Sequence, residues 1–478
     1  MNATWIWVVL PGATSLVLFF LRRREKLVLA IGLTLCLALA LLAWLLPIGE
    51  PISIGGPLPL PSFTVEDTLY LLGRRLVINA DSRSMLLIIY LSLAAWLGGS
   101  RISDLTRLFV PVALGMGALF TAALSVDPFL YAALLIAMAV MVSIPILSPP
   151  GKPVSSGVLR LLIFQIIGMG FILFASWFLE GMQINPANPA LFGRVALLMG
   201  FGFAFLMAIF PFHTWIPMIA EEAHPYAAGF VLFLLPTIVS IFGLEFISRY
   251  AWLRSVPALL LVLRGSGLLM VIVGGIWASF QRHLGRIFGY ATIVEIGFSL
   301  LALSLASGTG DAPIPPRILG IFFTLLVAEA IGMVIWAEAL SVIRQQAGGL
   351  SFEQTQGIVK RLPVATTALL LAHFSLAGMP LLAGFPAQLA LWFNLTEQGG
   401  PSGLLALIGC AGLFAAGLRA LAALVTGAEQ TDQKMQENRW QAVFFMAGWV
   451  VLLLLGMLPQ FFYPSVVRFT SSFLLTVP

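Results

Sequence analysis

The chain has 478 residues, of which 60% are hydrophobic and only 9% are charged, and its formal net charge is +5 at pH 7. A soluble domain is closer to half apolar and a quarter charged, so this composition excludes an ordinary soluble globular protein. Apolar runs of roughly 18 or more residues recur from end to end, without the alternation expected of barrel strands. Because lipid satisfies no backbone polar group, these runs predict an all-α polytopic membrane protein.

The first apolar run, about Trp5 to Phe20, is followed rather than preceded by its positive charges. A signal peptide has the reverse order, so we expect a retained first span with its N-terminus outside. The segment Gly49–Arg75 contains four prolines and mixed charge, which predicts an external loop that is strand-like or interfacial. In total we expect about 14 transmembrane helices, centred near Leu10, Ala38, Leu91, Gly115, Ala137, Ile167, Gly200, Leu235, Met270, Gly297, Ala330, Ser375, Phe414 and Val450.

The distribution of positive charge gives an orientation for this arrangement. With the N-terminus outside, 15 of the 25 Lys and Arg residues fall in inside loops, 8 in outside segments, and 2, Arg264 and Arg419, within spans. An excess of Lys and Arg marks the inner side of a membrane protein. The count therefore supports 14 spans with both termini on the outer face.

Two of the predicted helices are interrupted. The seventh contains Pro211, with Pro217 shortly after it, and the twelfth contains Gly378 and Pro380. An interior proline removes a backbone hydrogen bond and clashes with the preceding turn. One interpretation is that these are ordinary proline kinks. The other is that they mark a transport pathway, because paired interruptions at matching places in two repeats point to a binding site.

The placement of the interruptions predicts a repeat. If spans 4–8 and 9–13 form two five-helix units, the interrupted helix is the fourth of each, and an odd number of spans gives the two units opposite orientation. The predicted domains are an N-terminal three-span region with its external loop (1–100), a first repeat (101–250), a second repeat (251–426) and a C-terminal span (427–478).

The motifs around the interruptions resemble a known family. "PFHTWIP" (Pro211–Pro217) followed by "EAHP" (Glu222–Pro225) resembles the hallmark of the antiporter-like membrane subunits of respiratory complex I. The family also includes multisubunit sodium/proton antiporters and the membrane arms of energy-converting hydrogenases. "GRIFGYATIVEIGFSLLAL" (Gly285–Leu303) and "SLAGMPLLAGFPAQL" (Ser375–Leu389) resemble its tenth and twelfth spans. We expect no long lateral helix, so the chain is similar to the shorter types. The resemblance implies an integral protein of a bacterial or archaeal plasma membrane, or of its organelle equivalent.

The resemblance implies a central axis of charged residues, and this sequence departs from it. The family has a glutamate on span 5, lysines on spans 7 and 8, and a lysine or glutamate on span 12. All four corresponding positions here are neutral. They are Ile136 or Ala137 on span 5, Leu206 on span 7, a residue of Leu234–Pro236 (such as Pro236) on span 8, and Gln388 on span 12. None of these side chains titrates at neutral pH, so the usual proton path is predicted to be missing.

Other ionisable side chains lie within predicted spans. Glu295, Glu329 and His373 could form a partial relay in the second repeat. The alternative is that glutamates pair with Arg264 or Arg419 and hold helices together, because intramembrane charges usually find partners. Glu329 and Glu338 are nine residues apart, about 180° around a helix, and so do not form a carboxylate pair.

His213 has two interpretations as well. A near-neutral pKa suits a proton shuttle at the break. Alternatively, the ring hydrogen-bonds carbonyls freed by Pro211 and Pro217, and the missing lysine favours this second interpretation. Glu221 and Glu222 follow toward the inside mouth.

Three functions are compatible with these observations. The first is an antiporter-like subunit of a complex-I-like or hydrogenase-like assembly, with a degenerate path and a partly structural role. The second is active proton or cation translocation through a remodelled second repeat. The third is a subunit of an independent sodium/proton or inorganic-carbon transport system. We expect no catalytic redox site, no cofactor and no metal, with Cys36 and Cys410 as buried thiols. The expected partners are other membrane subunits, the lipid bilayer, and protons or sodium, but not nucleic acid.

Overall fold

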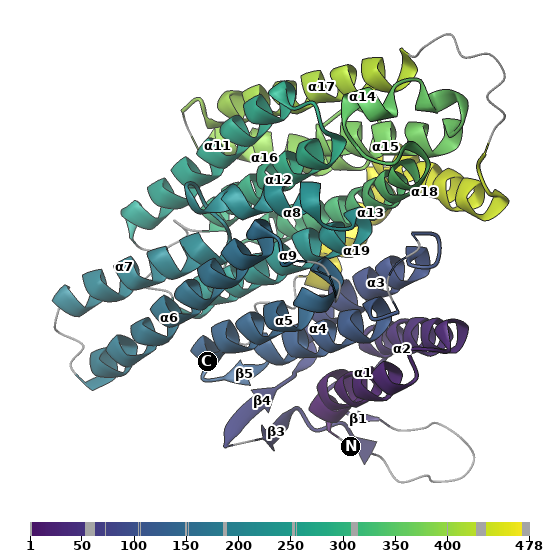
Figure 1. The fold of residues 1–478 in the computed structure, drawn as a ribbon. Coiled ribbons are helices and arrows are strands. Elements are labelled where there is room, and N and C mark those ends of the chain that lie inside the picture. Colours follow the sequence, from purple (N-terminus) through teal and green to yellow (C-terminus); the bar gives the residue numbers. More distant parts are fainter. Residues whose placement is uncertain are drawn as a thin grey trace.

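The fold is a bundle of apolar helices, seen in a computed structural model that describes residues 2–52, 63–71, 73–103, 105, 107–148, 151, 153–184, 189–250, 254, 256–306, 314–398, 400–426 and 436–470 (Figure 1). Within these ranges, ten helical segments are long and apolar enough to cross a membrane. They are α2 (Glu25–Leu45), η2 with α3 (Ala80–Ser82 and Arg83–Gly99), η3 with α5 (Phe129–Tyr131 and Ala132–Leu147), α6 (Ser156–Ile184), α9 (Pro225–Arg249), α11 (Pro257–Phe280), α12 (Leu284–Ala306), α13 (Pro316–Ala347), α17 (Ser402–Val425) and α18 (Arg439–Met457).

Shorter helices complete the bundle. Four are apolar: η1 with α1 (Trp5–Val9 and Leu10–Phe20), α4 (Phe109–Ala123), α7 (Pro189–Leu206) and α15 (Pro363–Leu376). The others are η4 (Phe212–Thr214), α8 (Trp215–Glu222), α14 (Phe352–Thr355), η5 (Ile358–Lys360), α16 (Gly384–Glu397) and α19 (Pro459–Thr470). Every centre predicted from the sequence lies within one of the long or short apolar helices. The polytopic helical class is therefore confirmed.

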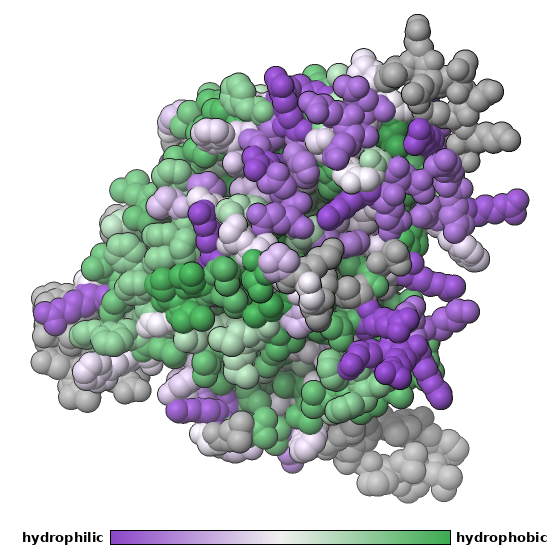
Figure 2. All heavy atoms as spheres, viewed as in Figure 1, coloured by the Kyte–Doolittle hydropathy of each residue, from purple (hydrophilic) through white to green (hydrophobic). Residues whose placement is uncertain are grey.

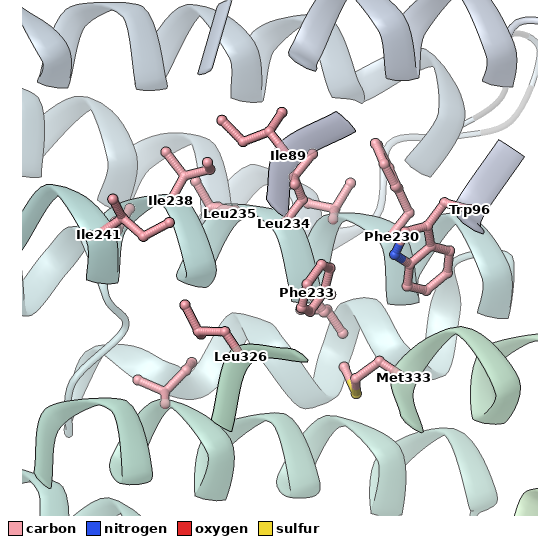
Figure 3. Close-up of a cluster of buried hydrophobic side chains, with 14 of the residues drawn as sticks. Ile89, Trp96, Phe230, Phe233, Leu234, Leu235, Ile238, Ile241, Leu326 and Met333 are labelled. Atoms are coloured by element: carbon pink, nitrogen blue, oxygen red, sulfur yellow. The ribbon is translucent and has the colours of Figure 1, made fainter. Parts of the chain in front are cut away.

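Burial separates central helices from peripheral ones. Nearly every residue of α9 and α12 is buried, whereas most of α18 is exposed. A helix that is apolar all round is stable when neighbours surround it, or when lipid does. Figure 3 shows α9 at the centre, where Phe233, Leu234 and Leu235 pack among Ile89 and Trp96 of α3 and Leu326 and Met333 of α13.

The predicted external segment contains strands, as expected. The hairpin β3 (Thr68–Leu71) and β4 (Arg74–Val77) is antiparallel, with Leu69 opposite Leu76, and β4 also pairs with β5 (Val126–Asp127). A two-stranded pair joins β1 (Pro51–Ile52) to β2 (Phe63–Thr64). In Figure 1 the β3–β5 sheet lies at one end of the helices, so it caps the bundle rather than entering it.

The C-terminal region contains a short helix that the sequence did not predict. The candidate span after residue 427 is α18, and it is followed by α19. This helix packs against the start of α13, where Val467 lies over Gly320. A Cβ at Gly320 would lie 2.4 Å from Val467, so glycine permits the close approach.

Candidate functional site

The first interruption separates α7 from α8. Helix α7 ends at Leu206, the backbone turns left-handed at Ala208 (φ 54°), and the Ile209 N–H donates to the Ala204 carbonyl at 2.9 Å. This bond from C″ to C3, next to a left-handed residue, is the Schellman arrangement of a helix C-terminus. The Phe212 N–H then donates back to the Ile209 carbonyl at 2.7 Å, and the chain re-enters a helix.

The second interruption has the same bonds. Helix α15 ends at Leu376, Gly378 is left-handed (φ 78°), and the Met379 N–H donates to the Phe374 carbonyl at 2.9 Å. The Leu382 N–H donates to the Met379 carbonyl at 3.3 Å. Each bond therefore recurs at positions shifted by 170 residues, from 209 to 379 and from 212 to 382.

The predicted break residues do not all lie at the breaks. Pro211, Gly378 and Pro380 do, since they fall between the flanking helices. Pro217 does not, because it lies in the first turn of α8. Proline is tolerated in a first turn, where its missing N–H has no intrahelical partner to lose. The interruption therefore spans residues 207–214 and not the whole motif through Pro217.

A glutamine side chain occupies the same place at both interruptions. Gln165 of α6 donates from Nε2 to the Leu206 carbonyl at 3.1 Å. Gln388 of α16 donates from Nε2 to the Leu376 carbonyl at 2.9 Å. Both glutamines are fully or almost fully buried, and the Oε1 atom of each has no hydrogen-bond partner among the described residues. The two amides thus satisfy equivalent carbonyls that the breaks release from their helices.

The favoured interpretation of His213 is not seen in the structure, since its ring makes no hydrogen bond to a freed carbonyl among the described residues. His213 instead stacks on Phe210, with ring centroids 5.4 Å apart, and its buried Nδ1 has no hydrogen-bond partner in the described part of the chain. Farther along, Glu221 pairs with Arg286 at 2.6 Å, which joins α8 to α12.

The expected charge positions in the first half are buried among apolar groups. Ile136, Ala137, Leu206 and Leu234 are each at most 2% exposed, and Pro236 is a buried residue inside α9. Figure 3 shows the neighbours of Leu234 and Leu235, which are hydrocarbon and aromatic side chains. The side chains drawn around Leu234 and Leu235 offer no hydrogen-bond partner to water.

In the second half, the structure brings Glu295 and Glu329 together. Helices α12 and α13 run antiparallel, and the Phe288 and Trp336 rings meet edge to face with their centroids 5.2 Å apart. Moving seven residues along each helix from that contact brings Glu295 opposite Glu329, and the two carboxyl groups interact electrostatically. Both are at most 4% exposed, and Glu295 Oε1 has no hydrogen-bond partner in the described ranges.

His373 does not join this pair directly. Its Nε2 lies 2.7 Å from the Leu413 carbonyl oxygen, and its ring packs on Trp336 at 4.6 Å. A carbonyl only accepts, so Nε2 carries the proton and Nδ1 is left without a partner among the described residues. Trp336 is seven residues from Glu329, which is about 10 Å along a helix. The predicted three-residue relay is therefore a carboxyl pair and a separate histidine.

The alternative of glutamate–arginine pairs is wrong for the described residues. Arg264 donates to the side-chain oxygen of Gln398, and Arg419 donates to the Ser279 carbonyl. The ion pairs in the described ranges are Arg107–Glu25, Arg249–Asp127, Arg286–Glu221 and Arg317–Glu397. All four involve exposed or half-exposed groups, so no arginine neutralises Glu295 or Glu329 there.

A third buried carboxyl group, Glu338, was identified in the sequence, but its hydrogen-bond partner was not. Glu338 of α13 accepts a hydrogen bond from Ser103 Oγ at 2.5 Å, and Gln345 donates to the Ser103 carbonyl at 3.0 Å. Tyr226 lies beside it and donates to the Trp96 carbonyl at 2.7 Å. The group connects the end of α3 to α9 and α13. Glu338 was visible in the sequence, but only the fold brings Ser103 to it.

Buried carboxyl groups and two matching interrupted helices inside an apolar bundle define an antiporter-like membrane protein. The family model described as NADH:quinone oxidoreductase/Mrp antiporter, TM, matches residues 154–415, which is more than half of the chain. The chain belongs to this family.

Curated relatives are similar over part of their length. NADH-quinone oxidoreductase subunit N of Desulfitobacterium hafniense (strain DSM 10664 / DCB-2) is 28% identical over 233 residues, which cover 46% of this chain and 45% of that protein. Formate hydrogenlyase subunit 3 of Escherichia coli (strain K12) is 31% identical over 216 residues, which cover 42% of this chain and 34% of that protein. The chain thus matches less than half the length of these two relatives.

Solved structures share the fold over nearly the whole chain. A chain of the Mrp complex from Dietzia sp. DQ12-45-1b has a TM-score of 0.77 at 16% identity, covering 99% of this chain and 97% of that chain. A chain of the membrane-bound sulfane sulfur reductase, an archaeal respiratory membrane complex, has a TM-score of 0.76 at 17% identity. The match covers 98% of this chain and 97% of that chain. A chain of respiratory complex I from Thermus thermophilus has a TM-score of 0.70 at 17% identity. The match covers 96% of this chain and 99% of that chain.

Proposed function

We propose that the chain is an antiporter-like membrane-arm subunit of a complex-I-like assembly, of the quinone oxidoreductase or membrane-bound hydrogenase type. Its ion path is degenerate and its role is largely structural. The observation that carries this proposal is the first interruption, where the lysine position is Leu206 and Gln165 holds the freed carbonyl. A neutral amide with a fixed hydrogen bond transfers no proton at neutral pH.

The proposal includes a membrane arrangement of 14 spans in two inverted five-helix repeats, with the four predicted domains and both termini outside. The ten long and four short apolar helices support this number. The backbone bonds that recur 170 residues apart, and the amide at each freed carbonyl, support the repeat. The distribution of Lys and Arg supports the orientation.

Other membrane subunits are the proposed partners. The printed names of the relatives describe subunits of a quinone oxidoreductase and a formate hydrogenlyase. Exposed apolar side chains on α18, such as Val443, Val450 and Leu454, give a surface that packs against lipid or a neighbouring helix. The structural role would be to seal and connect the membrane arm at such surfaces.

A second candidate function is translocation through the second half. Glu295 and Glu329 are adjacent, buried and without a cation partner among the described residues, which is an expensive arrangement in a membrane. His373 and Gln388 lie on the helices of the second interruption and would extend this path. His213 would contribute at the first interruption only if water reached its unpartnered Nδ1.

Ion uptake by vesicles containing the purified complex separates these functions. We would compare the parent with Glu295→Gln and Glu329→Gln and measure protons or sodium ions taken up per electron. For a structural subunit, both variants keep the stoichiometry of the parent, because no ion passes through either carboxyl group.

The matched control is Glu397→Gln, which removes an exposed carboxylate that pairs with Arg317. If Glu295→Gln and Glu329→Gln both lowered the ion-to-electron stoichiometry while the control kept it, the chain would translocate ions through its second half. The largely structural role would then be wrong. Equal assembly of all four complexes, checked by subunit composition, is required for this comparison.

A further inference from the structure

A basic cavity lies where four helices end at the same surface. Helix α1 ends and α2 begins there, and α3 ends and α4 begins there, since consecutive helices of the bundle alternate in direction. The cavity has a volume of about 290 Å³, and its charged lining consists of Arg22, Glu25, Lys26, Arg101 and Arg107. Figure 2 shows hydrophilic side chains gathered over this end of α2 and α3, next to hydrophobic surface.

The cavity lining contains more basic side chains than its one carboxylate can pair with. Glu25 is the single carboxylate among the described lining residues, and Arg107 already pairs with it at 2.7 Å. Arg22 packs over the Phe19 ring at 4.4 Å. Within the described part of the chain, the side chains of Lys26 and Arg101 make no hydrogen bond or ion pair. Asp104 lies outside the described residues.

The floor of the cavity is apolar and continues into the membrane-facing surface. Val28 and Phe109 are at most 2% exposed and close the floor from α2 and α4. Beside the cavity, the surface of α1 and α2 carries exposed hydrocarbon and aromatic side chains, including Phe20 (81% exposed) and Leu27 (42% exposed). A ligand that fills this site thus has an anionic group at the rim and an apolar part running along the helices.

We propose that this cavity binds the phosphate group of an anionic phospholipid from the leaflet at this surface. Basic pockets at the cytoplasmic ends of transmembrane helices suit anionic headgroups, and the guanidinium of Arg101 and the ammonium of Lys26 are the donors for the phosphate oxygens. Inorganic phosphate shares the charge but has no part that covers Phe20 or Leu27. The inference is independent of whether the chain translocates ions.

Native mass spectrometry of the full chain in detergent tests the proposal. The protein is titrated with phosphatidylglycerol or with phosphatidylcholine of the same acyl chains, and in a separate arm with sodium phosphate. The parent binds one phosphatidylglycerol more tightly than phosphatidylcholine. The double variant Lys26→Gln/Arg101→Gln loses about 30-fold in affinity, which corresponds to about 2 kcal/mol for two basic side chains near an anionic lipid.

The matched control is Arg282→Gln/Lys360→Gln. It removes two exposed positive charges outside the cavity lining, one in the connection between α11 and α12 and one at the end of η5. This control keeps the affinity of the parent, and the conservative variant Lys26→Arg keeps it too. Equal losses in the two double variants, or equal binding of the two lipids, would overturn the proposal. Displacement of the lipid by millimolar inorganic phosphate would assign the cavity to free phosphate and overturn the lipid assignment.

Discussion

At the scale of single residues, Gln165 and Gln388 stabilise the backbone at the two interruptions. Each donates one hydrogen bond to a carbonyl that its own helix has released. A buried carbonyl left without a donor costs about 1–3 kcal/mol. We therefore expect Gln165→Leu and Gln388→Leu each to lower the free energy of unfolding by about that amount, measured by thermal or chemical denaturation in detergent.

Gln356→Leu is the control for these substitutions, because Gln356 is exposed and follows the short helix α14. Surface substitutions away from special features usually change stability by no more than about 0.5 kcal/mol. If the buried variants were as stable as Gln356→Leu, water would be supplying the missing donors, and the breaks would be wetter than the described contacts indicate.

His283 lies in the connection between α11 and α12, outside the spans, and burial lowers its pKa from the usual 6.5. Glu221 opposes this shift, while Arg286 and Arg344 reinforce it. The folded state therefore resists protonation, whereas the unfolded state binds a proton near pH 6.5. Above about pH 6.5, His283 is neutral in both states and does not affect the free energy of unfolding. As the pH falls from there toward the pKa of His283 in the folded protein, protonation of the unfolded state lowers the free energy of unfolding. We expect the Tm to drop between pH 7.5 and 5.5.

The variant His283→Gln tests the assignment, because it removes the titrating group and retains a polar side chain. Its Tm should fall less than that of the parent over the same pH interval. Identical pH profiles would mean that other groups, such as the carboxylates at the helix ends, produce the dependence.

The residues of the candidate site differ in how far the sequence reveals them. Gln388 was identified from its place in a family motif, and Glu295 from its charge inside an apolar run. Gln165 carries no such signal, since a single amide in a long span is common and its partner carbonyl is 41 residues away. The pairing of Glu295 with Glu329 depends on the register of α12 against α13, which the Phe288–Trp336 contact reveals only in three dimensions.

At the scale of elements, the two interruptions share the same turn at the end of the first helix, formed by different residues. The left-handed position is Gly378 in one and Ala208 in the other. A left-handed conformation costs a non-glycine residue about 1–2 kcal/mol, and a Cβ at Gly378 would lie 2.4 Å from Gln388 Oε1. We expect Gly378→Ala to destabilise the protein by more than about 1 kcal/mol, measured by denaturation in detergent.

The reverse substitution, Ala208→Gly, is the matched comparison. It relieves the left-handed strain but removes one fully buried methyl group, worth about 0.8 kcal/mol. The two effects nearly cancel, so the stability should change little. A large loss in Ala208→Gly and none in Gly378→Ala would show that packing, and not backbone conformation, sets the geometry of the breaks.

The elements themselves were largely predictable because apolar length is a strong signal. Each predicted span centre lies in an apolar helix, and the prolines and glycine near 211 and 380 marked both interruptions. Helix α19 was not predicted, since Pro459, Pro464 and Arg468 interrupt its apolar pattern. Pro217 was assigned to the break because sequence alone does not distinguish a first-turn proline from one that ends a helix.

At the scale of the whole molecule, the two halves of the bundle differ in polarity. In the first half, Leu234 and Leu235 of the central helix α9 lie near Ile89, and the expected charges are absent. In the second half, Glu295 and Glu329 are buried side by side. A scaffold loses buried charges at little energetic cost, since each is unfavourable in a membrane, whereas a conducting path requires them. The asymmetry therefore favours a framework role for the first half.

Restoring one charge to the first half tests this asymmetry directly. Leu234 is 1% exposed and its neighbours are hydrocarbon and aromatic groups, so Leu234→Lys would bury an ammonium without a carboxylate beside it. The expected loss of stability is several kcal/mol, on the order of the 3–5 kcal/mol found when a buried charge lacks its partner. Leu234→Met conserves volume and should cost less than about 1.5 kcal/mol. If thermal denaturation in detergent gave the two variants the same Tm, water would have to reach α9, and the first half would be a hydrated path rather than a dry framework.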